Sequence, residues 1–192
     1  DHFVREEKPF FLYVAHCAPH WPLMAPEEEI KKYEHVYDEG WQKIREERYK
    51  KLIEKGIFKG DTTKLSEFMF PDLKWAENEN ENWDSRAMAV HAAMIDRMDQ
   101  NIGKLIDKLE ATGQLDNTVI IFMSDNGASS ERPSQYGIGF DRPSETRDGR
   151  EIHYPVKKSE EHLPGPETVM SGIGPVWANV ANTPFRYWKA RV

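Results

Sequence analysis

The chain has 192 residues, and 26 Lys and Arg against 33 Asp and Glu give it a formal net charge of −7. This length fits one domain or a large part of one, and the acidic balance argues against a general nucleic-acid binder. A single cysteine excludes an internal disulfide framework and a multi-cysteine zinc site, and no apolar run approaches the roughly 20 residues that cross a bilayer. The first residue is Asp and no signal peptide is recognisable, so we expect a piece of a longer protein.

The first part of the chain predicts one strand followed by two helices. Residues 9–15 form an apolar, aromatic and β-branched run that is typical of a buried strand. Pro26 followed by three glutamates predicts a short helix, because acidic groups face the positive end of the helix dipole. Apolar residues at helical spacing predict a second helix over 39–55, with Gly56 as its stop. Residues 57–82 are mixed and polar, and we expect them to cross the surface.

The clearest predicted element is a long amphipathic helix, which Asp84 or Ser85 can cap and Gly113 ends. Its apolar face comprises Met88, His91, Ala92, Ile95, Met98, Ile102, Leu105, Ile106 and Leu109. After a short turn, residues 119–123 form a near-continuous apolar run, typical of a strand buried on both faces of a parallel sheet. A helix, a short turn and a buried strand form half of a βαβ unit, so the predicted class is α/β.

A long polar insertion follows this second predicted strand. From about residue 128 to 175 the sequence is rich in Gly, Pro, Ser and charged residues, and no regular element is evident. Loops of this length are usually functional or mobile. Residues 177–189 are aromatic again.

The tetrapeptide Ser124-Asp125-Asn126-Gly127 directly follows the second predicted strand. Ligands of open α/β sheets bind at the carboxyl ends of strands. Asp125 offers a carboxylate and Asn126 a side-chain carbonyl, and both are hard oxygen ligands suited to Ca²⁺ or Mg²⁺. The alternative is ordinary turn chemistry, for which Asp, Asn and Gly are common.

His20 and Lys189 are candidate contacts for an anionic substrate. His20 lies between two prolines beyond the first predicted strand, and its imidazole can exchange a proton near neutral pH. Lys189 ends an aromatic and basic segment, and its compact ammonium suits sulfate or phosphate oxygens. The alternatives are a surface-loop histidine and a solvated lysine. His91 is expected in the core, and no role is assigned to His153 and His162 in the long loop.

Several short segments together form a recognisable series. In order they are 10–14, Ala18-Pro19-His20-Trp21-Pro22, 88–99, 115–118, Ser124-Asp125-Asn126-Gly127, 177–179 and Asn182-Thr183-Pro184-Phe185-Arg186. In this order the chain resembles the middle portion of a type I sulfatase of the arylsulfatase branch. The resemblance covers most of the chain except residues 57–82 and 128–175.

The resemblance implies that residues 1–192 are a partial catalytic domain, with part of an alkaline-phosphatase-like α/β sheet flanked by helices and incomplete at both ends. It implies hydrolysis of a small-molecule or glycan sulfate ester with one divalent cation, usually Ca²⁺ and less often Mg²⁺. Asp125 and Asn126 match the family's second pair of metal ligands. His20 matches the histidine that contacts the sulfate group, and Lys189 the lysine that binds sulfate and helps the leaving oxygen depart. The family is commonly exported to the periplasm or the extracellular space.

The family's nucleophile is a formylglycine made from Cys or Ser in the pattern Cys/Ser-x-Pro-x-Arg. Cys17 has Pro two positions later, but Trp21 stands where the pattern requires Arg. The segment 182–186 ends in Pro-x-Arg but begins with Asn. We therefore expect the formylglycine, and the first pair of metal ligands, upstream of Asp1, and we expect this piece to be inactive by itself.

Two other functions stay open. A relative in the same superfamily can be a phosphodiesterase or a phosphonate monoester hydrolase, and the chain could instead belong to a non-catalytic, glycan-binding pseudoenzyme. A sheet domain cut in the middle exposes strand edges and apolar faces, so we also expect the fragment to self-associate.

Overall fold

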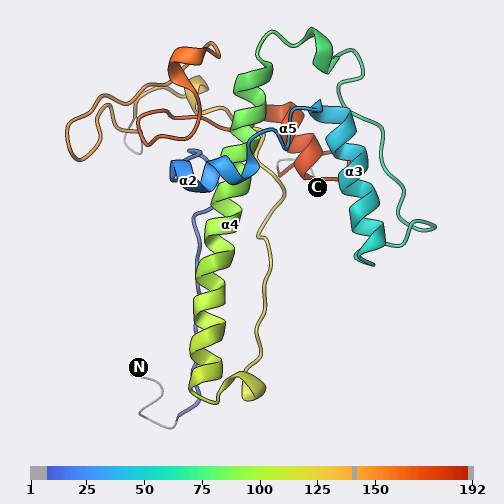
Figure 1. Ribbon diagram of the computed structural model, residues 1–192, viewed down its shortest axis with the longest axis vertical. Coiled ribbons are helices and arrows are strands. Elements are labelled where there is room, and N and C mark those ends of the chain that lie inside the picture. Colours follow the sequence, from blue (N-terminus) through green and yellow to red (C-terminus); the bar gives the residue numbers. More distant parts are fainter. Residues whose placement is uncertain (1–7, 140–141, 190–192) are drawn as a thin grey trace.

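The computed structural model describes residues 8–139 and 142–189. Within these ranges lie four α-helices, namely α2 (Glu27–Ile30), α3 (Gly40–Glu54), α4 (Glu81–Ala111) and α5 (Gly174–Ala181). The same ranges hold five 3₁₀-helices, namely η1 (Lys31–Tyr33), η2 (Trp75–Glu77), η3 (Leu115–Asn117), η4 (Pro133–Gln135) and η5 (Glu160–His162). In Figure 1 the other α-helices gather around the N-terminal half of α4, whereas its C-terminal half extends away from them.

Helix α4 is the predicted long amphipathic helix, but it begins earlier than the sequence suggested. Its N-cap is Asn80, whose carbonyl accepts the backbone N–H of Asp84 at 3.0 Å. The prediction that Asp84 or Ser85 caps the helix is therefore wrong: both side chains are buried and bond to other segments of the chain. Gly113 follows the end of the helix with φ 68°, a left-handed conformation that favours glycine, as predicted.

The two helices before α4 form where the sequence predicts them. Helix α2 follows Pro26 and has three glutamates in its first turn, next to the unpaired N–H groups. Helix α3 ends one residue before Lys55, and Gly56 takes φ 70° beyond it. Local signals thus mark the start of α2 and the end of α3.

The hydrophobic core lies around the N-terminal half of α4 and includes Trp41 and Trp177, which form a cluster with Trp75 at its edge. The ring centroids of Trp41 in α3 and Trp75 in η2 are 4.8 Å apart, and those of Trp75 and Trp177 in α5 are 5.8 Å apart. Trp75 therefore packs against the core, although the polar composition of residues 57–82 predicts a surface segment. The buried residues that α4 contributes are Trp83, Ala87, Met88, Ala89, Val90, Ala93 and Met94.

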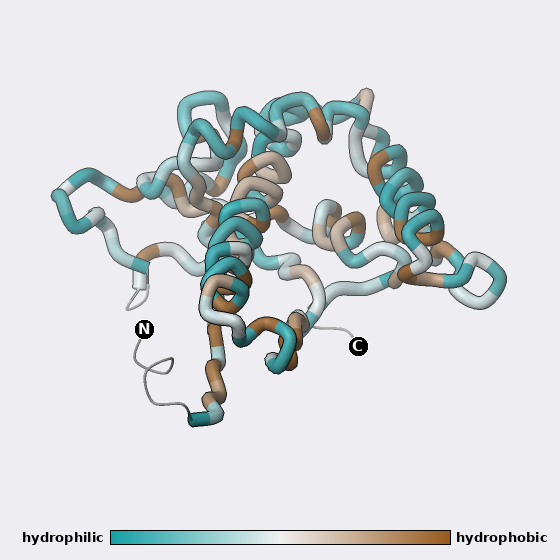
Figure 2. Tube along the Cα trace, turned by 60° about the horizontal axis from the view of Figure 1, so that its bottom comes forward, coloured by the Kyte–Doolittle hydropathy of each residue, from teal (hydrophilic) through white to brown (hydrophobic). Residues whose placement is uncertain are grey.

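The prediction that residues 9–15 and 119–123 are buried strands is not confirmed by the structure. No β-strand is formed within residues 8–139 and 142–189, where the β-bridges are isolated. Phe11 is 91% exposed and Phe122 is 72% exposed. Figure 1 shows both segments running along the C-terminal half of α4, and Figure 2 shows the apolar character of the N-terminal one. A strand is buried only when other strands pair with it, and the described residues supply no such partner, so the predicted sheet is not confirmed.

Much of the segment 128–175 folds against the N-terminal half of α4. The Nε of Arg86 in α4 donates to the carbonyl of Pro164 at 2.8 Å. The indole N–H of Trp83 donates to the carbonyl of His162 at 3.1 Å. The backbone N–H of His153 donates to the carbonyl of Thr168 at 2.8 Å and holds two parts of the segment together. In the part of the chain that the structure describes, no helix is both long enough and apolar enough to cross a membrane.

Candidate functional site

His20 lies in an exposed turn between Cys17 and the start of α2. Its backbone N–H donates to the carbonyl of Cys17 at 3.0 Å, which forms the turn. Its Nδ1 lies 2.6 Å from the carbonyl oxygen of Trp21. Because a carbonyl oxygen can only accept, Nδ1 carries the proton in this contact, and in neutral imidazole Nε2 is then the free acceptor. The turn therefore presents the Nε2 atom of His20 away from the backbone.

Lys189 lies on the other side of that imidazole. Its Nζ is 3.4 Å from Nε2 of His20, although 169 positions separate the two residues. Its backbone N–H donates to the carbonyl of Ala128 at 3.0 Å, which fixes the base of the side chain beside the segment that follows Asn126. The tertiary structure thus brings together the two residues that are predicted to contact an anionic ester.

Glu131 is a third member of this site, and no pattern in the sequence singles it out. Its Oε2 accepts from the indole N–H of Trp21 at 2.7 Å and from Ser129 Oγ at 3.1 Å, and lies 3.3 Å from Lys189 Nζ. Its Oε1 accepts from the hydroxyl of Tyr136 at 3.3 Å. The hydrogen bond from Trp21 is the main reason that the pKa of the Glu131 carboxyl lies below its ordinary value, and Lys189 and Ser129 act in the same direction.

Aromatic rings border the site on one side. The rings of Trp21 and Tyr136 are stacked with centroids 6.1 Å apart and planes 16° apart. The rings of His20 and Trp21 have centroids 5.2 Å apart. The guanidinium of Arg142 lies over the Tyr136 ring at 5.6 Å from its centroid. The polar groups of the site thus lie next to a pair of stacked aromatic rings.

Asp125 and Asn126, the expected metal ligands, are exposed and lie two to three residues before Ala128. The side-chain amide of Asn126 donates to Oδ1 of Asp125. The backbone N–H of Ala128 donates to Oδ1 of Asn182 at 3.0 Å and joins this turn to the C-terminal segment. Two hard oxygen donors suit Ca²⁺ but fall short of the six to eight that it takes. Among the described residues, no group of three or more His, Cys, Asp or Glu could hold a metal ion.

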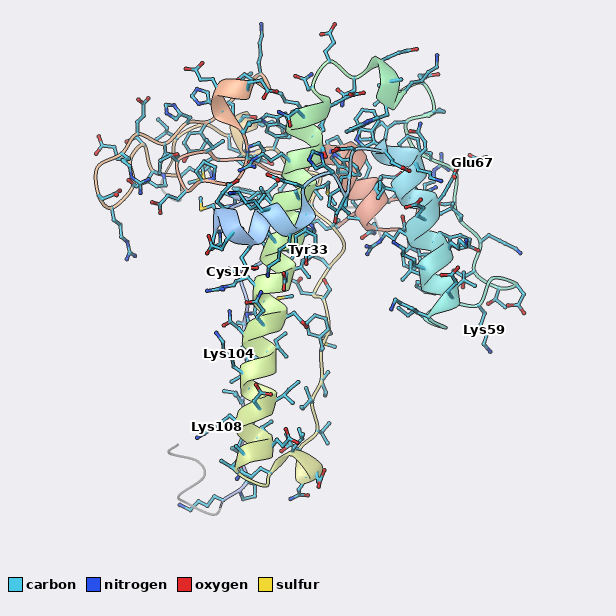
Figure 3. The ribbon with its side chains drawn as sticks, in the orientation of Figure 1. Cys17, Tyr33, Lys59, Glu67, Lys104 and Lys108 are labelled. Carbon is cyan, nitrogen blue, oxygen red and sulfur yellow. The ribbon has the colours of Figure 1, made fainter. Side chains whose placement is uncertain are left out.

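Cys17, His91, His153 and His162 lie outside the cluster of His20, Lys189 and Glu131. Cys17 is an exposed free cysteine three residues before His20 (Figure 3). The rings of His153 and His162 stack with centroids 4.2 Å apart in the long loop, beside a cavity of about 680 Å³. That cavity is lined by residues near α2, in α4 and in the segment 153–169, and neither His20 nor Lys189 borders it. Burial and the nearby Arg48 charge lower the pKa of His91 to about 4, but the residue is only partly buried by surface area and does not belong to the core cluster, so the expected core position is not confirmed.

Comparison with known proteins agrees with the family resemblance that the sequence motifs indicate. The Sulfatase family model matches residues 3–164 of this chain. An uncharacterized sulfatase of Schizosaccharomyces pombe is 35% identical over 184 residues, which is 94% of this chain and 31% of that protein. An arylsulfatase of Klebsiella aerogenes is 33% identical over 180 residues, which is 94% of this chain and 36% of that protein. The chain therefore spans about a third of the length of these relatives.

Proposed function

Because this chain belongs to the sulfatase family, whose fold is the alkaline-phosphatase-like α/β type, we propose that it is the central part of an enzyme that hydrolyses sulfate esters. The observation that carries the proposal is the 3.4 Å approach of Lys189 Nζ to His20 Nε2. The ammonium and the imidazole come from distant segments and meet at an exposed position. This arrangement is better explained by binding of an anionic ester than by packing of the core. The arylsulfatase of Klebsiella aerogenes, 33% identical, supports the same reaction class.

The chemistry of sulfate transfer explains the two residue types. Negative charge develops on the non-bridging and leaving oxygens as the ester bond breaks, and fixed donors stabilise it where it develops. The ammonium of Lys189 donates to those oxygens as a compact point charge. The imidazole of His20 contacts the sulfate group, and in its protonated form it can donate through Nε2. We assign both residues to catalysis and to substrate binding.

Asp125 and Asn126 would hold the divalent cation through their oxygen atoms, and Ca²⁺ is favoured over Mg²⁺ because the sulfatase family generally uses Ca²⁺. Such a cation stabilises negative charge on the sulfate oxygens. The further ligands and the formylglycine are expected in other parts of the longer protein, because the pattern Cys/Ser-x-Pro-x-Arg does not occur in these 192 residues. For the same reason we propose that this chain is inactive by itself.

We propose that residues 10–14 and 119–123 become strands of the family's sheet in the longer protein. Most of their side chains are apolar and exposed, as Val119 at 87% and Tyr13 at 81% illustrate. Such segments satisfy their backbone groups and bury their side chains when neighbouring strands pair with them. Asp125 and Asn126 would then lie at the carboxyl end of a paired strand.

The proposed function is tested with the full-length protein and a panel of esters. We expect faster hydrolysis of 4-nitrophenyl sulfate than of bis(4-nitrophenyl) phosphate or a phenyl phosphonate monoester. Turnover that favours the phosphorus esters would replace the sulfatase proposal with the related hydrolase. No turnover of any ester by a folded, metal-loaded protein would favour a glycan-binding pseudoenzyme.

Variants of the site residues extend this test. His20→Ala and Lys189→Ala should each lower kcat/KM for the sulfate ester by about 100-fold or more, because each removes a donor to developing charge. Lys157→Ala is the matched control, because Lys157 is an exposed lysine of the long loop. Equal activity of the His20, Lys189 and control variants would overturn the site assignment.

A further inference from the structure

The contacts of Glu131 point to a role beyond that of His20 and Lys189. We propose that Glu131 is a positioning residue that holds Lys189 and the His20 turn in the geometry needed to bind the sulfate group. This inference rests on the proposed sulfatase function. It follows from the four side chains that the single carboxylate joins, which come from three separate parts of the chain.

The first part of the argument concerns Lys189. A lysine ammonium at the end of a flexible four-carbon stem loses rotamer entropy of about 2 kcal/mol when it is fixed, so a defined position needs a partner. Glu131 Oε2 lies 3.3 Å from Lys189 Nζ, and the two side chains are only 32% and 27% exposed. Partial burial reduces screening of this pair by water and salt. The carboxylate therefore restrains the ammonium beside Nε2 of His20.

The second part concerns His20, which Glu131 reaches through Trp21. The 2.7 Å hydrogen bond from the indole to Glu131 fixes the Trp21 side chain. The carbonyl of the same residue accepts from Nδ1 of His20 at 2.6 Å, which fixes the ring orientation and the tautomer. Because Trp21 makes both contacts, a shift of Trp21 after loss of Glu131 would also shift the imidazole of His20.

The third part concerns charge. A carboxylate close to an anionic ester would repel it unless its charge were already compensated. Glu131 receives donors from Trp21, Ser129 and Tyr136 in addition to the Lys189 ammonium, so protein groups compensate its charge. Its pKa is lowered mainly by the Trp21 contact, so these donors favour the ionised form of the carboxyl group.

The kinetic test uses Glu131→Gln and Glu131→Ala in the full-length protein with 4-nitrophenyl sulfate. A displaced donor costs up to about 100-fold in rate, so we expect kcat to fall about 10- to 100-fold in Glu131→Ala, with a smaller change in KM. Glu131→Gln keeps the shape and an acceptor for Trp21 but loses the charge, so its kcat should lie between those of the wild type and Glu131→Ala. Glu167→Ala is the control, because Glu167 forms an exposed ion pair with Arg150 in the long loop.

A second measurement needs no substrate. The indole N–H resonance of Trp21, assigned with Trp21→Phe, should move toward the value of a water-exposed indole in Glu131→Ala and stay in place in Glu167→Ala. An unmoved resonance in both variants, or wild-type kcat in Glu131→Ala, would overturn the positioning role. If the wild-type protein is inactive but its Trp21 resonance still responds to Glu131→Ala, the sulfatase proposal is refuted. The hydrogen bond between Trp21 and Glu131 is then still supported. If Glu131→Ala does not fold, the kcat of Glu131→Gln decides the kinetic test, and Glu131→Leu, which removes the acceptor of the indole, replaces Glu131→Ala in the resonance measurement.

Discussion

Both carboxylate oxygens of Asp84 lie 2.6 Å from the ammonium of Lys158, although 74 positions separate the two residues. Asp84 is in the first turns of α4 and its side chain is 3% exposed, whereas Lys158 belongs to the long polar loop. The amide of Asn78 donates to the same carboxylate at 3.0 Å, and the ammonium lies 5.3 Å from the centre of the Trp83 ring. This buried pair fixes the loop to the helix that carries the core.

Loss of Lys158 should leave a buried and uncompensated carboxylate. Breaking a buried ion pair by removing one partner lowers the free energy of unfolding by about 3–5 kcal/mol. Because the Lys158 ammonium is partly exposed, we expect the loss in Lys158→Ala to lie near the lower end of this range. We expect the free energy of unfolding in urea to fall by about 3 kcal/mol. Lys157→Ala, which removes an exposed neighbour, should change it by less than about 0.5 kcal/mol. Equal urea midpoints for the two variants would contradict the structural role of this pair.

Gly40 should not tolerate a side chain. Its φ is 81°, and a Cβ built on it would lie 2.2 Å from Cγ of Trp75. Gly40→Ala therefore combines backbone strain with overpacking beside the tryptophan cluster, and should lower the free energy of unfolding by about 2–3 kcal/mol. Gly103→Ala is the matched control: Gly103 lies inside α4, a Cβ built on it would meet nothing within 4 Å, and the change should stabilise the protein by about 0.5–1 kcal/mol. A thermal unfolding midpoint that is unchanged in Gly40→Ala would refute this account.

His91 should make stability depend on pH below neutrality. Its pKa is lowered to about 4 by burial and by the charge of Arg48, so the folded state keeps the imidazole neutral where the unfolded chain binds a proton. Because the unfolded state binds more protons between about pH 6.5 and pH 4, stability falls as pH falls through this window, by up to about 3 kcal/mol. His91→Gln should therefore weaken the pH dependence of the free energy of unfolding in urea across this range. His16→Gln, at an exposed histidine, should leave that dependence unchanged, and an unchanged dependence in His91→Gln would contradict the prediction.

The isolated chain should self-associate through its exposed apolar segments. Ile121 is 76% exposed and Phe122 is 72% exposed, and no strand within the described residues pairs with their backbones. Extended apolar segments with unpaired backbone groups pair readily with other copies. We expect light scattering after size exclusion to give a mass that rises with concentration, and Ile121→Lys to reduce the rise. A constant monomer mass at all concentrations would contradict this expectation.

The helices were predictable because their signals are local, whereas the strands depend on partners elsewhere. Gly56 and Gly113 end their helices through their own φ angles, which no distant segment has to supply. In contrast, the apolar patterns of residues 10–14 and 119–123 indicate only that each segment is able to form a buried strand. Whether it is buried depends on neighbouring strands, which a pattern within the segment cannot reveal.

The candidate site was predictable only in part. The proposed roles of His20 and Lys189 come mainly from the family resemblance, and nothing in their spacing shows that the two side chains meet. Glu131 was missed because it stands in a Gly-, Pro- and Ser-rich stretch without periodicity, and its importance comes from Trp21, 110 positions away. A carboxylate whose role depends on such distant donors has no signature in the sequence around it.

The separation of the site residues also has a consequence for protein synthesis. His20 and Lys189 are 169 positions apart, so at roughly 5–20 residues per second the ribosome adds the lysine about 10–30 s after the histidine. Late in that interval the nascent chain contains the imidazole and the carboxylate of Glu131 but lacks the ammonium that lies beside both. A translation product that stops between residues 181 and 188 therefore has the buried residues of the helical core but lacks the ammonium of the proposed anion site.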